Sequence, residues 1–173
     1  MKWLLLTGAV FVGLILLVAL VGACLPKGHV ASRSAEFKSQ PAAIWAVITN
    51  IAAFSEWRAG VTKVEILPDS KGKRWREEGS QGAIDFEIVE ATPPGRLVTR
   101  IADPKLPFGG TWTYHIEPSG AGSKVTITEN GEVYNVFFRF FSRFVFGYTS
   151  SMDTYLNSLG KKLGDSITIR SQA

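Results

Sequence analysis

Few residues in this chain have the type and spacing that catalysis requires. The sequence contains no Gly-x-Ser-x-Gly turn, no glycine-rich phosphate loop, no His-Glu-x-x-His pair and no cysteine nucleophile with an accompanying base. Glu77 and Glu129 are the two acids we nominate for general acid–base work, a role that needs burial to raise the pKa of the carboxyl group. The two histidines, His29 and His115, are expected at the surface, and we expect no bound metal and no cofactor.

The sequence contains more residues suited to binding an apolar molecule than residues suited to catalysis. Side chains two residues apart in a strand share a face, so Trp112 and Tyr114 lie together, and Glu129 lies on the apolar face of the last predicted strand. The predicted ligand-binding residues are Trp75, Phe86, Trp112, Tyr114, Glu129, Phe141, Phe144, Tyr148 and Met152. For any one of them a packed core is the commoner explanation, whereas hydroxyls and an acid among apolar side chains favour a small-molecule pocket. Arg58 and Arg100 are candidate cations at its mouth for an acidic ligand.

These side chains must be positioned by a sheet and by helices. Pro41 stands where a first-turn proline is favoured, and Ile44, Trp45 and Ile48 follow it at helical spacing. Short turns rich in glycine and proline, one of them at residues 68–72, separate the predicted strands, which favours an antiparallel meander. The strands are expected at residues 30–37, 61–67, 74–78, 83–90, 96–101, 111–117 and 124–133, with short helices from 41 to about 50 and from 51 to 57.

A single long helix is predicted from Val136 to Gly164. Apolar residues recur along it at every third or fourth position, the spacing of an inward-facing stripe. Its first part holds six of the eleven phenylalanines, with Arg139 and Arg143 among them. Two interpretations stay open. These turns pack on the sheet with their arginines in solvent, or exposed phenylalanines and arginines contact lipid headgroups.

The N-terminal segment is long and uncharged. Between Trp3 and Leu25, 19 of 23 positions are apolar, and the other four are one threonine and three glycines. About 20 such residues span a bilayer core of ~30 Å, so we favour a stable membrane anchor. A cleaved secretory signal is one alternative, although its apolar region is normally shorter. A lipoprotein signal is the other, because Val21-Gly22-Ala23-Cys24 resembles the bacterial lipobox, in which the cysteine carries the lipid.

The rest of the composition is that of one soluble domain. The 173 residues carry a net charge of +4, and the basic side chains are scattered, which argues against a nucleic-acid partner. The single cysteine, Cys24, excludes an intrachain disulfide. We expect a membrane anchor or signal segment at residues 1–25, a linker at 26–29, one domain at 30–165 and a C-terminal tail at 166–173.

The domain resembles the SRPBCC superfamily, which includes START-type, birch-pollen-allergen-like and polyketide cyclase/dehydrase branches. The resemblance covers residues 30–165 and implies an α+β helix-grip fold. In that fold a curved antiparallel sheet wraps a long C-terminal helix, with an apolar cavity between them. The motifs that carry it are Pro41-x-x-Ile44-Trp45-x-x-Ile48-x-Asn50, Phe54-x-x-Trp57-Arg58, Val61-x-x-Val64, Thr111-Trp112, Pro118-x-Gly-x-Gly-Ser-Lys-Val and Leu156-x-x-Leu159.

Three functions compete for this domain. We predict a membrane-anchored domain that binds a small hydrophobic or amphipathic molecule, lipids included, without catalysing a reaction. The alternative is a polyketide-cyclase/dehydrase-like enzyme that uses the same cavity, with Glu129 or a tyrosine as acid. The third is a stress or envelope-interaction module whose core is filled and binds no ligand, and the volume of the cavity separates it from the other two. The expected partners are a hydrophobic molecule or lipid and a membrane, and not nucleic acid.

Overall fold

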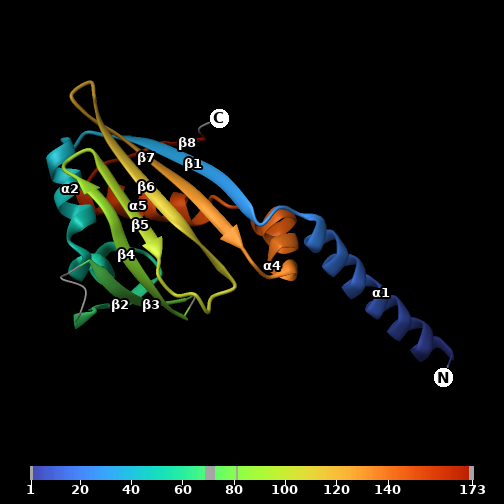
Figure 1. Ribbon diagram of the computed structural model, residues 1–173. Helices are drawn as coiled ribbons and strands as arrows, with labels where there is room; N and C mark the ends of the chain where they lie inside the picture. The colour runs from blue at the N-terminus through green and yellow to red at the C-terminus, as the bar shows by residue number, and fades with distance from the viewer. Residues whose placement is uncertain (1, 69–72, 81, 172–173) are drawn as a thin grey trace.

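An eight-stranded antiparallel sheet carries most of the domain (Figure 1). The computed structural model describes residues 2–68, 73–80 and 82–171, so most of the turn predicted at 68–72 lies outside the described residues. The strand order β2-β3-β4-β5-β6-β7-β1-β8 confirms the predicted meander and places β1 beside β7. The strands are β1 (Gly28–Phe37), β2 (Val61–Ile66), β3 (Arg74–Gly79), β4 (Gly82–Thr92), β5 (Arg96–Ile101), β6 (Phe108–Ser119), β7 (Gly122–Val133) and β8 (Ile169–Ser171).

Helices α2 (Pro41–Thr49) and α5 (Ser150–Leu163) cover the inner face of this sheet. α2 begins at the predicted proline and buries Ile44 and Ile48 completely, as the helical spacing indicates. α5 buries Met152, Leu156 and Leu159 against the strands. The short helices η1 (Ile51–Ala53) and α3 (Phe54–Trp57), also predicted, form a second apolar cluster with the inner end of β3. The inner face therefore holds the core, as helix-grip folding requires.

The prediction of one long helix from Val136 to Gly164 is wrong, because the helix is interrupted in its middle. α4 (Val136–Phe141) continues into a π-helical turn, η3 (Ser142–Phe146), and α5 starts only at Ser150. Gly147 separates the two parts at φ +71°, a conformation that residues with a side chain rarely adopt. The apolar spacing of the sequence continues across this break, so periodicity alone did not reveal it.

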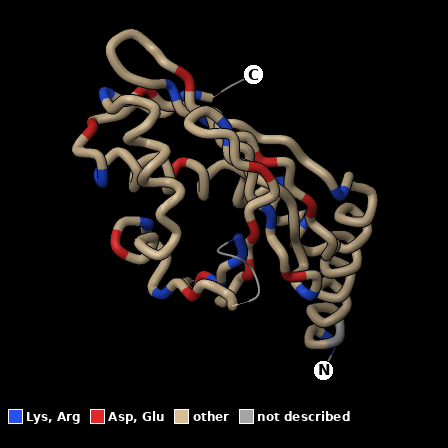
Figure 2. The backbone as a smooth tube through the Cα atoms, turned by 60° about the vertical axis from the view of Figure 1, so that its left-hand side comes forward, with Lys and Arg blue, Asp and Glu red and all other residues tan. Residues whose placement is uncertain are grey.

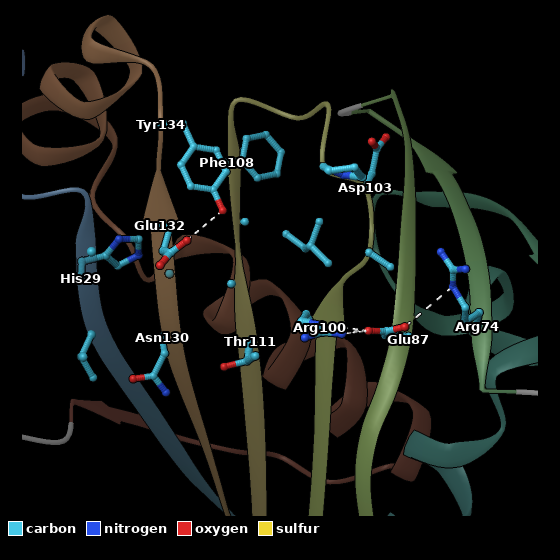
Figure 3. A pocket seen from close by; sticks show the side chains of 18 residues that line it. His29, Arg74, Glu87, Arg100, Asp103, Phe108, Thr111, Asn130, Glu132 and Tyr134 are labelled. Carbon is cyan, nitrogen blue, oxygen red and sulfur yellow. Dashed lines mark hydrogen bonds and ion pairs between the residues drawn. The ribbon is translucent and has the colours of Figure 1, made fainter. Parts of the chain in front are cut away.

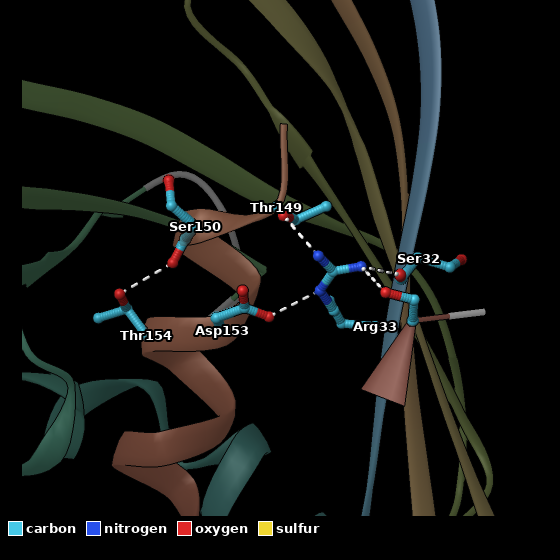
Figure 4. Close-up of polar contacts among 7 residues, drawn as sticks. Ser32, Arg33, Thr149, Ser150, Asp153 and Thr154 are labelled. Atoms are coloured by element: carbon cyan, nitrogen blue, oxygen red, sulfur yellow. Dashed lines mark hydrogen bonds and ion pairs between the residues drawn. The ribbon is translucent and has the colours of Figure 1, made fainter. Parts of the chain in front are cut away.

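The C-terminal tail predicted at residues 166–173 includes a strand. β8 pairs with the free edge of β1, and an edge strand with unpaired backbone groups favours such pairing. Arg33 of β1 connects the two strands to α5 through side-chain hydrogen bonds (Figure 4). It donates to Asp153 Oδ1 at 2.9 Å, to Thr149 Oγ1 at 2.9 Å and to Ser171 Oγ at 2.9 Å. The start of α5, the edge of the sheet and the chain end are thereby joined. β1 itself starts at Gly28, within the predicted linker.

The N-terminal helix α1 (Lys2–Cys24) projects away from the domain (Figure 1). Its most apolar stretch makes no buried contact, and its length and composition fit either a membrane span or a signal sequence. Figure 2 shows no acidic residue along it, whereas basic and acidic residues are both scattered over the domain. α1 meets the domain through its C-terminal end, where Gly22 is buried beside α4.

Candidate ligand-binding cavity

A cavity of about 1050 Å³ lies between the inner face of the sheet and the helices. Its volume is at the upper end of the range for small-molecule sites. Strands β1 to β7 form one side, and residues of α2, η1, α3, α4, η3 and α5 form the other. Six of the nine predicted ligand-binding residues line it: Trp75, Phe86, Trp112, Tyr114, Glu129 and Tyr148. A space of this size does not fit the hypothesis of a filled core.

The other three predicted residues lie outside this cavity. Met152 is completely buried in the main core between α5 and the sheet. Phe141 and Phe144 point to solvent, with 39% and 59% of their surface exposed. The reason is the break at Gly147, which takes α4 and η3 off the axis of α5 and turns the expected stripe outward.

One polar cluster, the His29 cluster, stands at the end of the cavity nearest α1. It consists of His29, Trp112, Glu129 and Tyr148, all of which line the cavity. His29 Nε2 lies 3.2 Å from Glu129 Oε1, and Trp112 Nε1 donates to Glu129 Oε2 at 2.9 Å. The imidazole stacks on Tyr148 with 3.7 Å between ring centroids. Both carboxylate oxygens are thereby engaged, as a largely buried charge requires.

The expectation that His29 lies at the surface is wrong. Its side chain is 12% exposed, and its Nδ1 is buried with no hydrogen-bond partner among the residues that the structure describes. The inward direction follows from the register, in which His29 stands opposite Gly131 on the inner face of β7. Counting alternate positions back from the inward-facing residues of β1 would have found it. His115 does lie on the outer face, where its Nε2 is 2.7 Å from an Arg96 nitrogen.

A second polar cluster, the Glu77 cluster, stands against β3. Trp75 Nε1 donates to Glu77 Oε1 at 2.8 Å, and Arg58 forms a salt bridge to the same oxygen. The Arg58 guanidinium also lies 4.8 Å from the ring centroid of Phe54 and 5.1 Å from that of Tyr155. The Glu77 side chain is 8% exposed, and burial is what a general acid–base role for this residue requires. Its charge is paired with the Arg58 cation. The Glu77 cluster combines an apolar surface with one fixed cation.

Two tyrosine hydroxyls lie between these clusters. The rings of Tyr114 and Tyr155 are 5.4 Å apart, and each residue exposes 5% of its surface or less. Burial raises the pKa of Tyr114 to about 12 and the pKa of Tyr155 well above its usual value. Both hydroxyls are therefore neutral at physiological pH and can donate or accept a hydrogen bond. Tyr155 was not among the predicted binding residues, although it lies on the inward stripe.

A second hollow, of about 1100 Å³, lies at the ends of the central strands, among side chains of β1 and β3 to β7 (Figure 3). Three of its charged residues, Arg74, Glu87 and Arg100, pair with each other. Arg100 donates through Nε to Glu87 at 2.8 Å, and Arg74 approaches the same carboxylate at 3.8 Å. Arg100, which we expected as a cation at the mouth of the cavity, is thus engaged by its cross-strand neighbour. The apolar lining makes the inner cavity the better candidate for a hydrophobic ligand.

The structure offers no metal ligands in the part of the chain that it describes. Across residues 2–68, 73–80 and 82–171, no three His, Cys, Asp or Glu side chains converge as they would around an ion. Glu129 and His29 form a pair without a third such partner.

The chain belongs to the family described as polyketide cyclase / dehydrase and lipid transport, whose model matches residues 29–164. This confirms the resemblance that the motifs indicated. The chain has no match among curated proteins. Known structures share the fold at low sequence identity, and three illustrate the range.

A conserved protein from Geobacillus kaustophilus is 14% identical, with a TM-score of 0.67 over 82% of this chain and 99% of its own. A START superfamily protein from Mycobacterium smegmatis is 13% identical, with a TM-score of 0.62 over 79% and 97%. Norcoclaurine synthase from Thalictrum flavum is 13% identical, with a TM-score of 0.64 over 80% and 88%. These likenesses show the helix-grip fold and extend to both START-type and enzymatic proteins.

Proposed function

We propose that the domain binds a small hydrophobic or amphipathic molecule, such as a lipid, in the inner cavity, and that α1 anchors it in a membrane. The cavity of about 1050 Å³ carries this proposal, because its walls are apolar and its polar atoms gather at a few points. The His29 and Glu77 clusters and the tyrosine pair supply those points. An apolar body with one or two polar groups is the chemistry that such walls accept.

Filling the cavity tests the binding proposal. Ile84 lines it and is 8% exposed, so Ile84→Trp would occupy part of the space. We expect this variant to bind the fluorescent fatty acid cis-parinaric acid at least tenfold more weakly. Val89→Trp is the matched control, because Val89 lies on the same strand, is 54% exposed and does not line the cavity. A folded Ile84→Trp protein with unchanged affinity would contradict the proposal.

Native mass spectrometry of the protein purified from its own host identifies the natural ligand. A bound mass that disappears in Ile84→Trp and persists in Val89→Trp would support the cavity as the binding site. A protein that carries no bound mass and also does not bind cis-parinaric acid would contradict the binding proposal.

The anchor is tested inside α1. Leu14 and Leu17 lie near the middle of the helix, where each aspartate costs roughly 2.5–3.5 kcal/mol of insertion free energy. We expect the Leu14→Asp/Leu17→Asp protein to leave the carbonate-resistant membrane fraction, and the Leu14→Ala/Leu17→Ala control to stay there. Membrane association that survives both aspartates would contradict a spanning anchor.

A second candidate function is catalysis in the same cavity, and the His29 cluster favours it. Glu129 orients the imidazole through Nε2, which leaves Nδ1 to act as a general base on a substrate proton. A polyketide-cyclase-like reaction would need such a base. The test compares His29→Gln with wild type on a poly-β-ketone substrate. Lost turnover with retained substrate binding would support catalysis by His29. Equal conversion by both proteins would contradict the role of His29 as the base.

A further inference from the structure

The last turn of α1 is fastened to the domain by a buried arginine. Arg139 of α4 is 6% exposed, and its Nη1 donates to the carbonyl oxygens of Gly22 at 3.1 Å and Leu25 at 3.2 Å. Its Nε donates to Val133 O at 2.9 Å and its Nη2 to Tyr134 O at 2.9 Å. The final carbonyls of a helix lack partners and attract a cation, so Arg139 caps α1 and joins it to the end of β7.

The backbones of α1 and α4 also lie in direct contact. A side chain built on Gly22 would place its Cβ 2.0 Å from Val136 O, so only glycine permits this approach. The position of α4 relative to α1 is therefore fixed by backbone packing as well as by Arg139. Both interpretations of the sequence placed Arg139 at the surface, and for this residue both are wrong.

Next to this junction, α4 and η3 expose an unusual amount of apolar surface. We call it the α4–η3 face. It consists of Phe137, Phe138, Phe141, Phe144, Val145 and Phe146, which are between 38% and 66% exposed. A cluster of exposed large apolar side chains marks an interaction surface. The exposed Arg143 lies within it, and aromatic residues with a basic residue are typical of the headgroup region of a bilayer.

The α4–η3 face is also part of the cavity. Phe138, Ser142 and Phe146 line the cavity, while Phe138 is 49% and Phe146 is 66% exposed. Residues that face both solvent and cavity stand on its rim. Figure 1 shows α4 between the sheet and the base of α1. The rim formed by α4 and η3 is thus the part of the opening that lies beside the membrane segment.

We infer that the α4–η3 face is embedded in the headgroup region of the membrane that holds α1, and that an amphipathic lipid passes between this membrane and the cavity across the rim. This inference rests on the proposed anchor and cavity and adds the route between them. The bilayer is the occupant because the face adjoins the end of an apolar helix whose position Arg139 fixes.

Fluorescence in vesicles tests the contact. The full chain with Cys24→Ser is reconstituted in vesicles of phosphatidylcholine and phosphatidylglycerol, with one cysteine introduced as Phe144→Cys and labelled with the fluorophore NBD. We expect strong quenching by lipids that carry a nitroxide near the headgroup. The control is Ala121→Cys, an exposed position in the turn at the opposite end of β6 and β7, which should not be quenched.

The outcomes separate this inference from the proposed function. Quenching at 144 and not at 121 supports it. A protein that stays in the vesicles with no quenching at 144 overturns it while leaving the anchor intact. A protein that fails to enter vesicles overturns the anchor as well, and the inference with it.

The route is tested with side chains that do not line the cavity. Phe141→Ser/Phe144→Ser removes two aromatic groups from the face and none from the cavity wall. We expect transfer of cis-parinaric acid from vesicles to the protein to slow by about tenfold or more, because the membrane contact of the face depends on the apolar area that these rings bury. Affinity measured in detergent should not change. Unchanged transfer would overturn the route, whereas lost affinity in detergent would assign the two rings to binding.

Discussion

The imidazole of His29 occupies the space in which a side chain at Gly131 would stand. The two residues are partners across β1 and β7, and a Cβ on Gly131 would lie 2.3 Å from His29 Cε1 and 2.4 Å from Nε2. The ring is held there by Tyr148 on one face and by Glu129 at its edge. The absence of a side chain at Gly131 is therefore what lets the His29 cluster form.

Gly131→Ala should displace His29 and disrupt the cluster. Loss of a hydrogen bond to a charged group that is mostly buried costs about 1–3 kcal/mol, so the free energy of unfolding should fall by that amount. Chemical denaturation measures it, and the NMR shifts of the His29 ring report the displacement. In Gly28→Ala, the control on the same strand pair, the added Cβ has its nearest neighbour at 3.9 Å. Equal behaviour of the two variants would show that the ring does not depend on Gly131. The bulkier change Gly131→Leu would meet the same ring.

The domain should lose stability between pH 10 and 12. Burial raises the pKa of Tyr114 to about 12, whereas the unfolded chain loses this proton near pH 10. The contribution is complete below pH 10 and declines as pH rises through the folded value, by roughly 2–3 kcal/mol. Urea denaturation at pH 9 and pH 11.5 measures the decline. Tyr114→Phe should show a smaller one, and an identical decline in both proteins would place the effect elsewhere.

Removing the Glu77 carboxylate should be costly. Glu77→Ala leaves the Arg58 guanidinium, 18% exposed, and the buried Trp75 Nε1 without their common acceptor. Breaking such a pair on one side costs about 3–5 kcal/mol when it is fully buried, and we expect 2–4 kcal/mol here. The double variant Arg58→Met/Glu77→Ala should recover part of the loss, because no unpaired cation remains. Thermal unfolding of the three proteins tests this, and strict additivity would argue against a coupled pair.

Arg139 and Arg143 should behave differently although they are four residues apart. Arg139→Met removes donors from four carbonyl oxygens and should lower the free energy of unfolding by about 2–4 kcal/mol. Arg143 is exposed, and Arg143→Met should change it by less than about 0.5 kcal/mol. Protease cleavage near Leu25 should also become faster in Arg139→Met alone. Equal stability of the two variants would contradict the capping of α1.

Cys24→Ser should remain in the membrane fraction. Cys24 is exposed at the last position of α1, and cleavage before it would remove the Gly22 carbonyl that Arg139 binds. Fractionation and intact-mass measurement of the mature chain test this together. Release of the serine variant, or a wild-type chain that begins at a lipid-modified Cys24, would instead support the lipoprotein alternative.

Much of the fold could be predicted from the sequence because it depends on local patterns. Alternation along β6 and β7 placed Trp112, Tyr114 and Glu129 on the inner face, where they lie. Pro41 marked the start of α2, and short turns marked the meander. Five of the six correctly predicted cavity residues followed from such counting, since a strand fixes the direction of every second side chain, and Tyr148 followed from helical spacing.

The remaining features were decided by tertiary structure, because they join segments that are distant in sequence. His29 and Glu129 are 100 positions apart, and only the pairing of β1 with β7 brings them together. Helical spacing alone predicts that Arg139 is a surface charge. It is buried because α4 packs on α1, where its guanidinium donates to the carbonyl of Gly22. The apolar spacing that includes Phe141 and Phe144 continues past Gly147 into α5, and the break at that glycine leaves these two rings facing outward. Periodicity states which residues share a face, whereas long-range packing decides what that face meets.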